Sequence, residues 1–217
     1  MKYIFLDMDG TIIDSKMGIT KSVQYALKDR GIIIDDLDLL ERHIGPPLKD
    51  GFMEYYGFSE AEAEDTIRIY RKYYNAKGIY EIELYEGIEE LLKKLKAANF
   101  KVVVATSKLE TAAKSIVEYF NLTDYFEDVC GASEDDTRTS KESVIRYALE
   151  KHKIGDLSQV IMVGDRRYDV EGAKAVGIPS IGVLYGYGDR EELETAGADY
   201  IVENLEELFQ LISKLNL

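Results

Sequence analysis

Two aspartates one residue apart, Asp7 and Asp9, come directly after a short apolar run and are followed by Gly10 and Thr11. The run, residues 3–6, is typical of a buried strand. Ligands bind at the carboxyl ends of strands in a parallel sheet, so the two carboxylates lie where a binding site is expected. The pattern suits a site that binds a hard cation and attacks phosphorus. For an isolated Asp-x-Asp-Gly, however, a simple turn is the better explanation.

A second apolar run, residues 160–163, also ends at an acid, in Gly164-Asp165, and Asp169 lies four residues further on. Both carboxylates could face one site if a helical turn begins there. With Asp165 near Asp7, the oxygen ligands of a Mg²⁺ site would be complete, because Mg²⁺ uses one or two carboxylates plus waters and substrate phosphate. For Asp169, a helix cap or an ion pair with a neighbouring arginine is an equally good explanation.

Two weaker signals lie between these acids. A β-branched run, residues 102–105, ends in Thr106 and Ser107, and hydroxyls at a strand end can hold phosphate oxygens. Ser107 is explained at least as well as an ordinary helix N-cap. Lys141 opens a helical pattern, where the helix dipole favours anions. It either points at a bound anion or is an ordinary exposed surface charge.

The elements that must position these residues alternate along the chain. Short β-rich runs followed by helical patterns predict βαβ units and therefore an α/β fold with a Rossmann-like parallel sheet. The strands are expected at residues 2–6, 101–105, 128–131, 159–163, 180–183 and 200–202. The helices are expected at about residues 88–98, 109–120, 141–151, 169–176 and 205–214.

Residues 15–84 break this alternation, because they show helical periodicity and one ambiguous strand-like stretch, residues 32–34. We expect a small α-helical domain there, inserted into a core domain made of residues 1–14 and 85–217. The connections would lie near residues 14–16 and 82–87. If both leave the same side of the core, the insert could hinge over Asp7 as a lid.

The composition limits the kinds of molecule that the protein is expected to bind and the compartment in which it is expected. The chain of 217 residues carries a net charge of −14, which argues against binding to nucleic acid. Because the chain has a single cysteine, Cys130, it can form no intramolecular disulfide, which fits a reducing, cytoplasmic compartment. We interpret Cys130 as a buried structural thiol. The first apolar run is too short for a signal peptide, and no run approaches the ~18 residues of a membrane span.

Taken together, three apolar strands end in Asp-x-Asp, Thr-Ser and Gly-Asp, in that order, with a lysine between the last two. This ordered set resembles the haloacid dehalogenase superfamily of phosphotransferases. The resemblance covers the whole chain: the motifs, the Rossmann-like core with helices on both faces, and a helical cap inserted after the first motif.

The resemblance implies a role for each matching residue. Asp7 would be the nucleophile that forms an aspartyl phosphate, and Asp9 the general acid and base. Thr106 would bind phosphate, together with Ser107 and the Gly10 segment. Lys141 would offset the charges of Asp7 and the phosphoryl group.

The resemblance also implies Mg²⁺ as cofactor. Asp165, Asp7 and the backbone carbonyl of Asp9 would hold the ion. Asp169 would either orient waters on the metal or support Lys141.

The substrate is expected to be a small phosphorylated metabolite, with phosphoglycolate or a nucleoside monophosphate as the best guess. Relatives that hydrolyse phosphoglycolate often carry Gly-Asp-Ser in the last motif, and the motif lysine is often followed by proline, whereas this chain has Arg166 and Glu142 there. Gly-Asp-Arg, with the glycine-rich residues 182–188, looks more like the bacterial 5'-nucleotidase-like branch. The alternatives are a mutase of the β-phosphoglucomutase type and a non-catalytic, phosphate-binding regulatory protein. A monomer or a homodimer is expected.

Substrate choice is expected to come from the cap. Its candidate cations are Arg42, His43, Lys49 and Arg71, each of which is explained more simply as a solvated helix charge. The loop Gly45-Pro46-Pro47-Leu48 resembles one that approaches the active site in relatives. Some of the 16 tyrosines, such as Tyr55, Tyr56 and Tyr74, could stack on a base or form an amphipathic core.

Overall fold

The computed structural model describes residues 2–215, which form two compact units. One unit, the core, consists of Met1–Ile12 and Leu84–Leu217, and the other, the insert, of Ile13–Glu83. The boundaries expected from the sequence, 14/15 and 84/85, differ from these by two residues and by one.

The core is built on a six-stranded sheet in which every neighbouring pair of strands is parallel. The α/β fold with a parallel sheet is therefore confirmed. From one edge to the other the strands are β5 (Asp128–Ala132), β4 (Lys101–Leu109), β1 (Tyr3–Leu6), β6 (Val160–Gly164), β7 (Ser180–Val183) and β8 (Tyr200–Val202). All six had been expected. The main difference is that β4 runs four residues beyond its predicted end.

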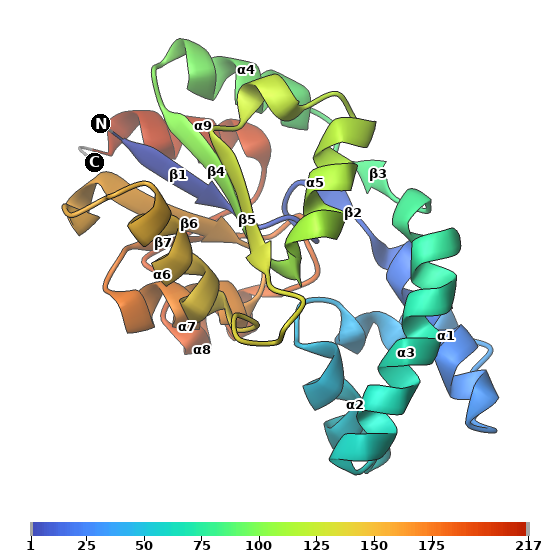
Figure 1. The fold of residues 1–217 in the computed structure, drawn as a ribbon. Helices are drawn as coiled ribbons and strands as arrows, with labels where there is room; N and C mark the ends of the chain where they lie inside the picture. Colours follow the sequence, from blue (N-terminus) through green and yellow to red (C-terminus); the bar gives the residue numbers. More distant parts are fainter. Residues whose placement is uncertain (1, 216–217) are drawn as a thin grey trace. The chain divides into compact units, whose positions relative to one another are not determined.

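Helices flank this sheet, with α4 and α9 on one side and α6 and α7 on the other (Figure 1). The helices are α4 (Ile88–Ala97), α5 (Glu110–Tyr119), α6 (Lys141–Lys151), α7 (Arg167–Val176), α8 (Arg190–Ala196) and α9 (Leu205–Lys214), with short 3₁₀ turns at Thr123–Tyr125 and Leu157–Gln159. The sequence did not predict α8, because this seven-residue helix buries only Leu193 and so shows no apolar face. Its start is fixed by Asp189, whose carboxylate accepts from the Glu192 N–H at 2.8 Å.

The buried core between α6 and the sheet is apolar. It contains Phe5 of β1, Val103 of β4 and Met162 of β6, all fully buried, together with Val144 of α6. Because both faces of the central strands are covered, these strands carry continuous apolar runs without polar alternation.

The insert is helical, with α1 (Lys16–Asp29), α2 (Leu48–Tyr56), α3 (Glu60–Ala76) and 3₁₀ turns at Leu37–His43 and Gly78–Tyr80. Two short strands that the sequence did not reveal, β2 (Ile13–Asp14) and β3 (Glu83–Leu84), pair with each other where the chain enters and leaves the insert. Residues 32–34 form no strand. Helix α3 starts with a capping box, in which Ser59 and Glu62 satisfy each other's backbone N–H groups.

Within residues 2–215, no helix has both the length and the apolar character needed to cross a membrane.

Candidate active site

The polar strand ends converge because β4, β1 and β6 are neighbours in the sheet. In the register of the sheet, Leu6 of β1 lies between Val104 of β4 and Val163 of β6. Asp7, the next residue, extends the ladder, since its N–H donates to the Val163 carbonyl at 2.9 Å. Asp7 and Asp165 therefore follow neighbouring strands, which their expected place in one metal site requires.

Lys141 is the centre of a buried ion-pair cluster. Its ammonium lies 2.7 Å from Asp7 Oδ1 and 2.8 Å from Asp169 Oδ1, and donates to the Ala105 carbonyl at 3.0 Å. Only 4% of its side chain is exposed, so the reading of Lys141 as a surface charge is wrong. Burial disfavours the ammonium, but the charges of Asp169 and Asp7 outweigh it and raise the pKa of Lys141.

Asp165 is fully buried at the end of β6. Its Oδ2 accepts from the Tyr187 N–H at 2.9 Å, and its Oδ1 from the Thr11 hydroxyl at 3.1 Å. Burial, and then the charges of Asp169 and Asp7, raise the pKa of Asp165 well above its ordinary value. The two hydrogen bonds hold the carboxyl group of Asp165 in place.

Asp7, Asp165 and Asp169 together offer oxygen ligands within 4.8 Å of one another. All three are buried, and Lys141 supplies a single positive charge to the three carboxyl groups. An all-oxygen donor set with only one positive charge beside it suits a hard divalent cation such as Mg²⁺. Two of these residues, Asp7 and Asp165, are the expected metal carboxylates.

Asp169 serves two partners at once. Its Oδ1 contacts Lys141, while its Oδ2 accepts from the Arg166 N–H at 3.1 Å. The expected support of Lys141 is thus present, whereas the expectation of an N-cap at Asp169 is wrong, because Arg166 is the N-cap and Asp169 accepts from its N–H as the third residue of α7. The Arg166 side chain lies instead against Glu192 of α8, at 2.8 Å.

Asp9 has a partner to which the sequence assigned no role. Lys108 Nζ lies 2.8 Å from Asp9 Oδ2, and both side chains are largely buried. The other oxygen, Asp9 Oδ1, is buried and has no hydrogen-bond partner within residues 2–215. The signal that could have found Lys108 was its place directly after Thr106 and Ser107, but the strand was expected to stop at residue 105.

The two hydroxyl residues lie within β4 itself. Thr106 is buried, and its Oγ1 accepts from the Lys108 N–H at 3.2 Å. The N-cap of α5 is Leu109, so the reading of Ser107 as a helix cap is wrong.

Glycines let the loops approach Asp165. Gly10 has φ +79°, and a Cβ there would lie 2.0 Å from Asp165 Oδ2, so no other residue fits. A Cβ on Gly186 would lie 2.3 Å from the Gly10 carbonyl oxygen. The glycine-rich segment noted in the sequence thus has a physical purpose, which is to bring the Tyr187 N–H to the Asp165 carboxylate.

The cap candidates all lie in the insert and have mostly local partners. The Arg42 guanidinium lies 4.4 Å from the Tyr55 ring centroid. Lys49 pairs with Glu60 and Glu64 of α3, while Arg71 is exposed on α3.

His43 is buried against Tyr56, with stacked rings 5.6 Å apart, and burial with help from Arg42 lowers its pKa to about 4. Tyr74 is buried and stacks on Tyr70, which supports the amphipathic-core reading for that tyrosine.

Comparison with known proteins identifies the family. Residues 3–183 match the haloacid dehalogenase-like hydrolase family, to which the chain therefore belongs. The crystal structure of a predicted phosphatase from Clostridium acetobutylicum is 49% identical, with a TM-score of 0.96 over 99% of each chain. A 5'-nucleotidase of Pseudomonas aeruginosa is 39% identical over 209 residues, covering 96% of this chain and 94% of the relative.

A third relative carries a different name. The tyrosine-protein kinase PtkA of Mycobacterium tuberculosis is 38% identical over 185 residues, which are 85% of this chain and 62% of the kinase. Family, fold and the more fully covered relatives agree, and the protein is a phosphatase of the haloacid dehalogenase family.

Proposed function

We propose that the protein is a Mg²⁺-dependent phosphomonoester hydrolase that works through an aspartyl phosphate, an acyl phosphate formed on Asp7. The observation that carries this proposal is the buried cluster in which Lys141 bridges Asp7 and Asp169 beside Asp165. Buried charges are costly to a fold, so such a cluster is expected where chemistry requires it. The favoured substrate class is a nucleoside 5'-monophosphate, because a relative that is 39% identical and covered over 94% of its length is named a 5'-nucleotidase.

In the first step, a carboxylate oxygen of Asp7 attacks the phosphorus of the monoester. The bond between phosphorus and the ester oxygen breaks as the new bond forms, and Asp9 gives its proton to the departing alcohol oxygen. Lys141, 2.7 Å from Asp7 Oδ1, offsets the negative charge that accumulates as one anion approaches another.

In the second step, water attacks the phosphorus and Asp9 takes up its proton. The bond between phosphorus and the Asp7 oxygen breaks, which releases inorganic phosphate and restores both carboxyl groups. Thr106, with the backbone around Gly10, would hold phosphate oxygens in both steps.

Asp7, Asp165 and the Asp9 carbonyl would hold Mg²⁺, which when bound supplies charge neutralisation and orientation for the transferring phosphoryl group. Its charge would also stabilise the ionised form of Asp165, whose pKa burial raises.

Phosphoglycolate is the second substrate within the same reaction class, and a phosphosugar mutase the second enzyme. We further infer a monomer or homodimer, and a reducing, cytoplasmic compartment that fits the single free thiol of Cys130.

The test is a phosphate-release screen with Mg²⁺ over nucleoside 5'-monophosphates, phosphoglycolate and hexose 1-phosphates, with products identified by mass spectrometry. Hydrolysis of the nucleotides with the highest kcat/KM supports the proposal. Hexose 6-phosphate as product would instead indicate a mutase, and ATP-dependent phosphorylation of a tyrosine peptide would indicate a kinase. No turnover of any of these with Mg²⁺ would favour a phosphate-binding regulatory protein.

A further inference from the structure

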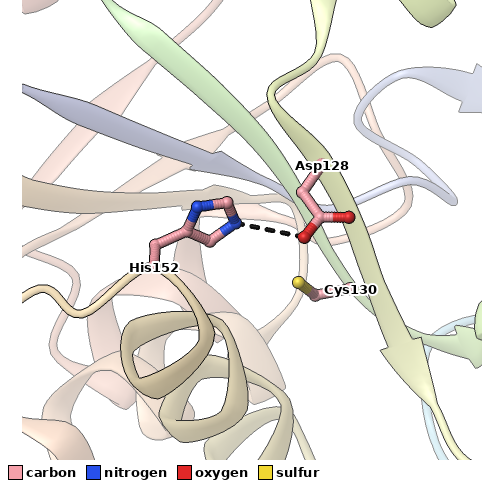
Figure 2. Close-up of side chains that lie close together, drawn as sticks. All are labelled: Asp128, Cys130 and His152. Carbon is pink, nitrogen blue, oxygen red and sulfur yellow. Dashed lines mark hydrogen bonds and ion pairs between the residues drawn. The ribbon is translucent and has the colours of Figure 1, made fainter.

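A second set of metal-ligand side chains gathers away from the phosphatase site, and Figure 2 shows them pointing toward one another. Asp128 and Cys130 lie two residues apart on β5, and therefore on the same face of the strand. His152 directly follows α6, the helix packed on that face, as its C-cap residue. One oxygen, one sulfur and one imidazole nitrogen of these residues lie within 4.8 Å of one another.

This set is separate from the cluster around Lys141. Lys141 is the first residue of α6 and His152 follows its last, so about 16 Å of helix separates them at 1.5 Å per residue. Asp128 is the first residue of β5, at the end of the strand opposite to the one where ligands are expected in a parallel sheet.

We propose that Asp128, Cys130 and His152 form a binding site for a borderline transition-metal ion of the Zn²⁺ type. A thiolate, an imidazole and a carboxylate are the ligands Zn²⁺ takes, whereas Mg²⁺ prefers oxygen alone. His152 Nε2 lies 3.2 Å from Asp128 Oδ2. This matches the separation of about 3.3 Å that two ligands at about 2.0 Å from a tetrahedral Zn²⁺ would have.

The surroundings permit an ion to enter and bind. The side chains of Asp128 and His152 are 17% and 14% exposed, so the set opens to solvent on their side, while Cys130 forms its buried floor. Binding requires the Cys130 thiol to lose its proton to the solvent. Burial raises the pKa of that thiol to about 12, but a coordinated thiol ionises readily.

Lys151 is the competitor for this site. Its ammonium lies 2.7 Å from Asp128 Oδ2, the oxygen that also faces His152. A bound cation would displace the ammonium, whose side chain is 36% exposed and can turn into solvent. The thiolate and the carboxylate would then balance the charge of a divalent ion.

The site is structural in character. It joins the start of β5 to the end of α6, two segments 24 residues apart in sequence. An ion bound only to the folded chain would raise the free energy of unfolding by mass action.

The experiment uses the whole protein, freed of metal by a chelator and then kept in excess Mg²⁺ so that the Asp7 site is occupied. Titration with Co²⁺, a spectroscopic substitute for Zn²⁺, should produce a thiolate-to-metal absorption band in the near ultraviolet. Cys130→Ser should abolish the band, and His152→Gln should weaken binding by about tenfold or more.

Two further variants sharpen the result. Lys151→Met should tighten binding by about two- to fivefold, because it removes the competing ammonium. Asp165→Asn, in the other carboxylate cluster, should leave the band unchanged. Zn²⁺ should also raise the Tm of the wild-type protein more than that of His152→Gln, which keeps the test decisive if Cys130→Ser does not fold.

The proposal is overturned if wild-type protein shows no thiolate band at millimolar Co²⁺. It is overturned equally if the band keeps its strength and affinity in both His152→Gln and Asp128→Asn.

Discussion

The core and the insert handle charge in opposite ways. Of the residues that the structure describes, the buried aspartate and lysine side chains are Asp7, Lys141, Asp165 and Asp169, all in the core. The insert buries hydroxyl groups and the neutral imidazole of His43, and its ion pairs, such as Lys49 with Glu64, lie at the surface.

This difference indicates that the chemistry belongs to the core. Exposed ion pairs contribute little to stability, whereas buried charges destabilise a fold unless their partners are held in good geometry. The core supplies that geometry from the ends of the adjacent strands β1 and β6 and from the first turns of α6 and α7, where the proposed chemistry needs its ionisable groups. The insert shows no comparable cluster in its part of residues 2–215, and its cations are expected to act on substrate choice alone.

The largest expected effect comes from the core. Asp7→Asn should reduce phosphate release by about ten-thousand-fold or more, because an amide cannot act as the nucleophile. The measurement is initial-rate phosphate release with circular dichroism as a check of folding. Asp124→Asn, an exposed position in the core unit, is the matched control. Turnover retained in Asp7→Asn would refute the nucleophile assignment.

Lys141→Met should lower both activity and stability. Activity should fall by roughly 10²- to 10³-fold, because one preorganised electrostatic contact to the reacting group is lost. The free energy of unfolding should fall by about 3 kcal/mol, since Asp7 and Asp169 lose the cation that pairs them. Denaturant unfolding checks the second figure, with exposed Lys174→Met as control. An unfolding energy equal to that of the control would mean that the pairing does not stabilise the cluster.

A pair of glycine variants contrasts the two units directly. Gly10 and Gly31 have nearly the same φ, +79° and +78°, but only at Gly10 would a Cβ strike Asp165. Gly31→Ala should therefore cost only about 1 kcal/mol of backbone strain with activity unchanged. Gly10→Ala should also displace Asp165 and reduce kcat/KM by about 100-fold. Equal losses of activity in the two variants would contradict the proposed close approach.

Asp165→Asn should lose Mg²⁺-dependent activity, and without Mg²⁺ it should be more stable than the wild type. The pKa of Asp165 is raised in the folded protein, so the folded state holds a proton that the unfolded state releases above about pH 4. The stability of the wild type should therefore fall as pH rises from about 4 toward the folded-state pKa. At pH 7 the variant should be more stable than wild type by about 1–2 kcal/mol while losing Mg²⁺-dependent activity.

Denaturant unfolding between pH 4 and pH 8, with and without Mg²⁺, measures these differences in the free energy of unfolding. Mg²⁺ should stabilise the wild type and not the variant, because the variant lacks a metal carboxylate. A wild-type curve that rises with pH relative to the variant would contradict the raised pKa.

The smallest effect is expected in the insert. Lys49→Met should change kcat/KM by no more than about twofold, since Lys49 is half-buried and already paired with Glu60 and Glu64. Steady-state kinetics on the substrate chosen by the screen are the measurement. Arg71→Met is the informative companion, because Arg71 is exposed and a rise in KM there would assign it to substrate recognition.

Much of the fold could be read from the sequence because apolar periodicity is a local signal. It located all six strands of the main sheet and the helices with a marked apolar face, such as α9 with Leu208 and Ile212 buried. It failed at α8, whose residues are nearly all polar, and at β2 and β3, which are two residues long. These elements depend on their contacts more than on their own pattern.

The sequence alone determined which side chains are available and that Asp7, Thr106 and Asp165 each follow an apolar run. Tertiary structure decided which of them meet. The order β4-β1-β6 makes three distant segments neighbours, buries Lys141 between Asp7 and Asp169, and places Lys108 on Asp9. No local pattern contains this information, because strand order and burial result from long-range packing, and burial is what turns surface-type charges into a site.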